Sequence, residues 1–233
     1  MPVANWQRDR GSRFYRGAAL AAALVALAGF FLTYFRPLAT GTFAGPPWAH
    51  VHGVLMFSWL ALVVIQAFLL PLHRQLGWLA LILAPAVAAS TMAIGVAATR
   101  RDLASGIEVG MAGNVTAPLI FCALVAAAIM RRKDPQWHKR LIFMATVLVL
   151  WPAWFRWRHF LPAMERPDIW LGLVLAQLPL ALAMLRDRLR FGAVHPAYLF
   201  VGLPLIAEQA FEAFAFGLPF WNRFGMWLYA VLA

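Results

Sequence analysis

The sequence predicts an all-α fold, a polytopic membrane bundle of about seven transmembrane helices, on three observations. The 233 residues are 63% apolar and 12% charged, whereas a water-soluble domain is about half apolar and about a quarter charged. The apolar residues fall in blocks of roughly 17–25, long enough to cross the hydrocarbon as helices. The basic residues lie between these blocks and do not gather on one soluble face, so a nucleic-acid partner is excluded.

The chain is predicted to form one integral-membrane domain over 1–233. Residues 1–16 form a basic cytoplasmic N-terminus, and 17–215 form the transmembrane bundle. Residues 217–233 are short and rich in tryptophan and tyrosine, which favours an interfacial helix or a short eighth helix. The predicted spans lie near 17–35, 49–72, 77–98, 113–130, 140–158, 169–185 and 195–215.

The ends of the spans carry signals of orientation and shape. The predicted topology places 13 Lys and Arg residues at the end that holds the N-terminus and 7 at the other end. Because short cytoplasmic loops are enriched in positive charge, the N-terminus is expected in the cytoplasm. Asp134 followed by Pro135 predicts an N-cap and a first helical turn. Prolines inside spans often kink them, and Pro85, Pro118, Pro152, Pro179 and Pro204 are such prolines.

Four histidines are spaced in a way that suggests a cofactor site. His52 and His73 are 21 residues apart, as are His138 and His159. Three heptads place each pair on one helical stripe, with Gln66 on the first stripe and Thr146 beside the second. If the two spans are antiparallel neighbours, His52 approaches His159 at one membrane surface and His73 approaches His138 at the other. Either pair suits haem b or a metal ion.

These histidines also have a simpler interpretation as cationic or hydrogen-bonding anchors at the membrane surface, and His195 falls at the same end as His73 and His138. His50 and His52 are two residues apart, so on a regular helix they point about 200° away from each other. Both can bind one ion only if the backbone at His50 and His52 is not yet helical. Pro46 and Pro47 just before them favour such a late start of the helix.

Glu208 and Glu212 are the only acids inside a predicted apolar span, and their i, i+4 spacing places them on one face beside Gln209. Lipid-facing carboxylates are costly, so both are expected to face the bundle interior. They fall in the outer half of the span, which also holds His50, His52, His159, Asn114, Arg156 and Arg158. A metal site with His50, His52, His159, Glu208 and Glu212 as ligands, a proton-handling or substrate pocket, and a Glu–Arg ion pair all remain open.

Four short motifs lie at the ends of spans: H-V-H-G at 50–53, H-R-Q-L-G at 73–77, H-K-R-L at 138–141 and H-P-A at 195–197. Over roughly 48–200 the chain resembles a group of bacterial inner-membrane proteins of unknown function, which implies a multi-pass protein of the inner (cytoplasmic) membrane. Histidines that bracket a helical bundle are also loosely similar to cytochrome b561-type haem proteins. The chain departs from those cytochromes because it lacks paired histidines at interior depth.

The function expected from these features is membrane redox chemistry with haem b or a transition metal as cofactor. Expected partners are the lipid bilayer, and then a quinone, other membrane subunits or a second copy of the chain. The alternatives are an accessory or assembly subunit of a larger complex, a small proton-coupled transporter that uses Glu208 and Glu212, and an enzyme that acts on a lipid-soluble substrate.

Overall fold

The structure is a computed structural model that describes Trp6 and residues 12–105 and 111–233. Arg8 and Arg10 of the predicted basic N-terminus lie outside these residues. The described chain is helical and contains no strand, which confirms the all-α class. Its α-helices are α1 (Ser12–Phe30), α2 (Arg36–Ala39), α3 (Trp48–Phe68), α4 (Leu70–Leu76), α5 (Leu79–Ala104), α6 (Ala112–Met130), α7 (Pro135–Val149), α8 (Trp151–Arg156), α9 (Ala176–Phe191), α10 (Leu203–Ala215) and α11 (Pro219–Leu232).

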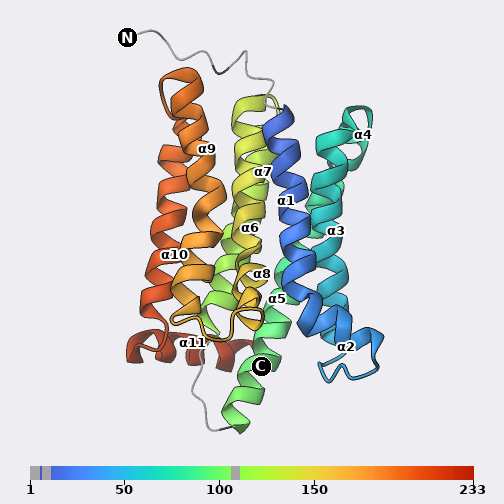
Figure 1. Cartoon of the computed structure of the whole chain (residues 1–233), viewed down its shortest axis with the longest axis vertical. Coiled ribbons are helices and arrows are strands. Elements are labelled where there is room, and N and C mark those ends of the chain that lie inside the picture. Colours follow the sequence, from blue (N-terminus) through green and yellow to red (C-terminus); the bar gives the residue numbers. More distant parts are fainter. Residues whose placement is uncertain (1–5, 7–11, 106–110) are drawn as a thin grey trace.

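The long helices lie side by side along one direction, and successive ones run up and down (Figure 1). One end of the bundle holds α4, the start of α7 and the end of α9. The opposite end holds α2 and α8, and α11 lies across it (Figure 1). The first end, called the basic end below, collects Arg131, Arg132, Lys139, Arg186 and other basic residues.

Six described helices are long and apolar enough to cross a membrane, one fewer than predicted: 13–39, 48–68, 79–104, 112–130, 168–191 and 198–215. The predicted span 140–158 is missing from this set because it is divided into α7 and α8 at Leu150. Pro152 causes the break, since it has no N–H to donate to Leu148 four residues earlier. Even so, α7 is packed into the core, where Leu141, Met144 and Ala145 are buried.

Prolines also widen three other helices into π-helical turns, at Phe31–Phe35, Asp168–Leu175 and Tyr198–Gly202. Each turn contains the residue four positions before a proline, whose carbonyl therefore loses its helical N–H partner. The three pairs are Thr33 with Pro37, Leu175 with Pro179, and Phe200 with Pro204. Pro85 and Pro118, in contrast, lie inside regular α-helix.

A helix cap and a helix break set the positions of His138 and His73. Asp134 is the N-cap of α7, and its side chain accepts hydrogen bonds from the backbone N–H groups of Gln136 (2.9 Å) and Trp137 (3.3 Å), which confirms the predicted cap. The predicted span 49–72 is interrupted, because α3 ends at Phe68 and α4 begins at Leu70 with a proline in its first turn. His73 therefore lies on a separate short helix and not on the same continuous stripe as Gln66.

Candidate functional site

The structure brings His73 of α4 and His138 of α7 together at the basic end. Their ring centroids are 5.8 Å apart, and the ring planes make an angle of 82°. The chain between them forms two long helices, α5 and α6, so their proximity is a product of the bundle and not of local sequence. No other pair of histidines in the described chain makes a ring contact.

Hydrogen bonding defines the tautomer of His138. His138 Nδ1 lies 2.8 Å from the carbonyl oxygen of Ala128. A carbonyl only accepts, so Nδ1 of His138 carries a proton, and in the neutral ring its Nε2 then has a lone pair. His73 Nδ1 is buried and has no hydrogen-bond partner among the described residues. The arrangement of His138 is typical of a metal-binding histidine, in which one ring nitrogen donates to a backbone carbonyl and the other faces the metal.

The two histidines line a cavity of about 250 Å³, called the histidine cavity, between α1, α3, α4, α7, α8 and α9. Gln66 and Thr146, the polar residues of the two predicted stripes, line the same cavity. Two cations also line it. Arg16 donates through Nε to the Ala67 carbonyl (2.9 Å), and the Lys139 ammonium lies 5.3 Å from the centre of the Tyr15 ring. The rest of the lining is largely alanine, valine and aromatic.

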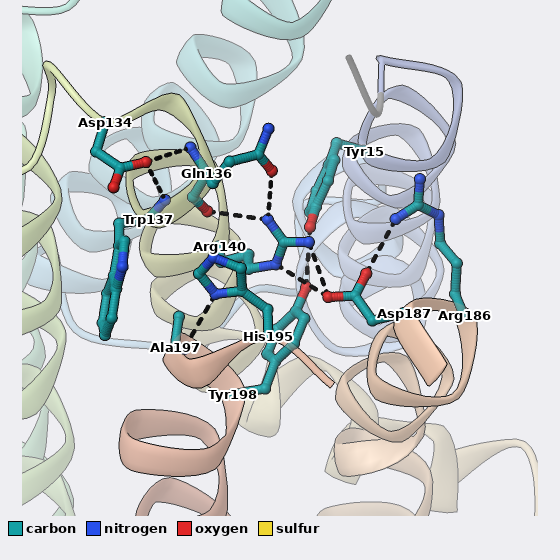
Figure 2. Close-up of polar contacts among 10 residues, drawn as sticks. All are labelled: Tyr15, Asp134, Gln136, Trp137, Arg140, Arg186, Asp187, His195, Ala197 and Tyr198. Carbon is teal, nitrogen blue, oxygen red and sulfur yellow. Dashed lines mark hydrogen bonds and ion pairs between the residues drawn. The ribbon is translucent and has the colours of Figure 1, made fainter. Parts of the chain in front are cut away.

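A fully buried ion pair includes Arg140, two residues from His138 (Figure 2). Arg140 of α7 donates through Nε (3.2 Å) and one terminal nitrogen (2.8 Å) to the same carboxylate oxygen of Asp187, on α9. Both side chains have 0% exposure. The other terminal nitrogen of Arg140 donates to the backbone and side-chain oxygens of Gln136, and Arg186 donates to the second oxygen of Asp187 (3.1 Å).

Two tyrosines join the ion pair to the neighbouring helices. The Arg140 guanidinium lies 5.4 Å from the centre of the Tyr198 ring. The Tyr198 hydroxyl is hydrogen-bonded to that of Tyr15 at 3.0 Å, and Tyr15 also lines the histidine cavity. The cluster therefore connects α1, α7, α9 and the π-helical turn Tyr198–Gly202 that leads into α10. It fixes the position of α7 two residues from His138.

Sequence reasoning missed the Arg140–Asp187 pair. Arg140 belongs to the predicted excess of positive charge and to the H-K-R-L motif at 138–141, neither of which implies burial, and Asp187 has no predicted role. One signal was present: Asp187 is the sole acid in a run with Arg186, Arg188 and Arg190 at the end of an apolar span. An aspartate among arginines is expected to form an ion pair. The sequence does not show that the arginine buried with it, Arg140, comes from another helix.

His195 belongs to the same end but not to the histidine pair. Its Nδ1 accepts a hydrogen bond from the Ala197 N–H at 3.1 Å, and Trp6 and Trp137 pack against its ring with centroid distances of 5.0 and 5.7 Å. Burial, followed by the positive charges of Arg140 and Lys139, lowers the pKa of His195 to about 4, against an opposite effect of Asp134. His195 is therefore a neutral cap for the helix that follows it.

This environment predicts a pH-dependent contribution to stability. The pKa of His195 is lower in the folded state than the value of about 6.5 expected after unfolding, so the unfolded state binds more protons between these values. Its contribution is complete above about pH 6.5 and is lost as the pH falls toward 4. We expect His195→Asn, which caps without titrating, to flatten the fall in thermal midpoint between about pH 7.5 and about pH 5. Equal slopes for the two proteins would contradict this.

Among the described residues, the structure does not group the ligands of the metal site predicted at the opposite end. Both His50 and His52 lie on regular helix, because α3 begins at Trp48, so the predicted late start is wrong. The two rings accordingly have different neighbours. His50 is hydrogen-bonded to the Tyr34 hydroxyl (2.9 Å), whereas His52 is hydrogen-bonded to the Ser90 hydroxyl (3.1 Å). One ion cannot take both as ligands in this arrangement.

His159 is exposed, in a single 3₁₀ turn (Trp157–His159) after α8, and makes no ring contact with His52. Across the residues that the structure describes, no three or more His, Cys, Asp or Glu side chains are grouped to hold a metal ion. The Glu–Arg ion pair, one of the alternatives left open by the sequence, is not found among the described residues. Arg158 instead lies 4.0 Å from the centre of the Phe155 ring and donates to the Phe155 carbonyl.

Glu212 does face the interior, as expected for a carboxylate in an apolar span. Its carboxylate accepts a hydrogen bond from the Thr116 hydroxyl of α6, and Gln209 donates to Glu208 at 2.7 Å. A second cavity of about 360 Å³ is lined by Glu212, Gln209, Asn114 and His52, and Trp221 of α11 lines it as well. This cavity gathers part of the predicted outer cluster, but Arg156 lines a different one.

Comparisons with known proteins add no relative, since no protein-family model, curated protein or solved structure matches the chain.

Proposed function

We propose that the chain is a seven-span protein of a bacterial inner membrane with its N-terminus in the cytoplasm. The six long apolar helices support a multi-pass membrane protein. The seventh crossing is α7 followed by α8, which from Pro135 to Arg156 measures about 33 Å at about 1.5 Å per residue, enough for the hydrocarbon core. The excess of Lys and Arg at the basic end supports the orientation. The amphipathic α11 then lies in the outer interface.

We propose further that the protein binds one haem b, through His73 and His138, and takes part in membrane electron transfer. The observation that carries this proposal is the 5.8 Å approach of two histidines from separate helices beside an apolar cavity. One buried nitrogen of His73 has no partner, and in the neutral ring the Nε2 of His138 has a lone pair. Paired imidazoles are common axial ligands of haem iron.

The other residues of the cavity fit the same group. Haem is flat and largely apolar with two carboxylates at one edge, and the histidine cavity is apolar with Arg16 and Lys139 at the end where the histidines lie. These cations would neutralise the carboxylates, and the small apolar side chains of α1, such as Ala18 and Ala22, would contact the ring. When bound, the haem iron would supply a one-electron redox couple; the protein would set its ligands and exclude water.

The test is an absorption spectrum of the detergent-purified protein, oxidised and then reduced with dithionite, together with iron analysis of the same sample. We expect a Soret band that shifts on reduction and about one haem per chain. His138→Ala and His73→Ala are expected to remove the band. His50→Ala and His159→Ala are the matched controls, because neither side chain lines the histidine cavity, and they are expected to keep it.

A protein that stays colourless and free of iron when expressed with sufficient haem would overturn the haem proposal. Retention of the full band in His73→Ala and His138→Ala would support haem binding but would show that other residues are the iron ligands. Each variant should be compared by thermal unfolding and size-exclusion chromatography, so that loss of colour is separated from loss of fold.

A further inference from the structure

A cavity that carries an arginine lies at the end opposite the histidine pair. It has a volume of about 590 Å³ and lies between α1, α3, α5, α8 and the segment 43–46; we call it the arginine cavity. Arg156, in the last turn of α8, lines it. The cavity shares His52 with the cavity of Glu212, but Glu212 itself lines only the latter.

Arg156 has no counter-charge within the described residues. Its guanidinium lies 4.3 Å from the centre of the Phe30 ring, and one terminal nitrogen donates to the Pro152 carbonyl at 3.1 Å. No carboxylate of the described chain lies within ion-pair distance of it, unlike Arg101, Arg140 and Arg166, which each have an aspartate. Since a partly buried charge in a membrane protein is costly without a partner, an arginine in this position favours an anion in the cavity beside it.

The remaining lining indicates the rest of the ligand. The hydroxyl oxygen of Thr33, which lines the cavity, is buried and has no hydrogen-bond partner among the described residues. Arg101 lines the cavity as well, but its charge is paired with Asp102 at 2.9 Å. The other lining side chains are mostly apolar, among them Met56, Phe57, Leu60, Ile94 and Ala97. A single charge next to a large apolar volume matches a molecule with a charged head and a hydrocarbon tail.

We propose that the arginine cavity binds an anionic amphiphile, a molecule with a carboxylate or phosphate head and an apolar tail, with Arg156 as the cation that holds the head. Guanidinium groups bind carboxylate and phosphate through charge-assisted hydrogen bonds, and Arg156 has donors left after its bond to Pro152. The head can come from a free fatty acid or from an anionic phospholipid, and both present the same chemistry to this site.

The test is native mass spectrometry and thermal unfolding of the full-length protein in a neutral detergent, with oleate and phosphatidylglycerol as separate probes. We expect wild type to bind one molecule of at least one probe and to be stabilised by it. Arg156→Gln is expected to weaken that binding about tenfold or more, as is typical for loss of a charge-assisted hydrogen bond. Arg158→Gln is the matched control: it removes the same charge two residues away, from a side chain that does not line the cavity.

A second variant guards against misfolding of Arg156→Gln. Ala97→Leu fills part of the cavity while keeping Arg156, so it is expected to weaken binding of the same probe. Binding of oleate alone would identify a free carboxylate amphiphile, and binding of phosphatidylglycerol alone a lipid headgroup; either supports the proposal. Absence of binding by both probes would overturn it. Equal affinity in wild type and Arg156→Gln, or unchanged affinity in Ala97→Leu, would also overturn it.

Discussion

Replacement of Asp187 by alanine is expected to lower the free energy of unfolding by about 3–5 kcal/mol. The substitution leaves the Arg140 guanidinium fully buried without its counter-charge, and both partners have 0% exposure. The remaining hydrogen bonds of Arg140, to Gln136, do not replace a negative charge. Unfolding of the purified protein in detergent, followed by circular dichroism against denaturant or temperature, measures the effect.

A matched control is available in a second Arg–Asp pair. Arg166 and Asp168 are two residues apart, and their side chains are 63% and 34% exposed. Because exposed ion pairs contribute about 0–1 kcal/mol, Asp168→Ala is expected to change stability little. The double variant Arg140→Met, Asp187→Leu is expected to recover much of the stability that Asp187→Ala loses, since apolar residues of similar volume often replace a buried pair well. Similar losses for Asp187→Ala and Asp168→Ala would contradict the structure at this position.

Replacement of Gly29 by alanine is expected to destabilise the protein by about 1–3 kcal/mol, the usual cost of overpacking. A Cβ atom at Gly29 would lie 2.3 Å from the carbonyl oxygen of Ala153, so α1 and α8 must separate. The obstacle is backbone and cannot rotate away. Small residues at such crossings are what allow helices to approach closely within membranes. The same unfolding measurement applies.

The matched control lies on the same helix. A Cβ atom at Gly17 would meet no heavy atom within 4 Å. Alanine is the better helix former by about 0.8–1.0 kcal/mol, so Gly17→Ala is expected to be neutral or stabilising. Opposite signs for the two substitutions would separate the close contact of α1 with α8 from the general effect of glycine in a helix. An equal loss of stability in Gly17→Ala and Gly29→Ala would contradict the close contact between Gly29 of α1 and Ala153 of α8.

Several features could be predicted from the sequence because they depend on local chemistry. The all-α class follows from composition and from the length of the apolar blocks, which need neither a partner nor a topology to be recognised. The cap at Asp134 follows from one side chain and the N–H groups two and three residues later. The proline at position 152 signalled a distortion, although whether a proline bends, widens or breaks a helix depends on its surroundings, as Pro85 and Pro118 show.

Only the tertiary structure decided which polar residues meet. His73 and His138 lie on different helices, and the equal spacing of two histidine pairs predicted partners at both ends of the bundle with equal weight. The structure joins one pair and leaves His159 exposed, in a 3₁₀ turn beyond the end of α8. Arg140, Asp187 and Arg156 illustrate the same limit. Whether a charge is paired, exposed or left facing a cavity depends on helices far away in sequence, and periodicity within one helix carries no information about its neighbours.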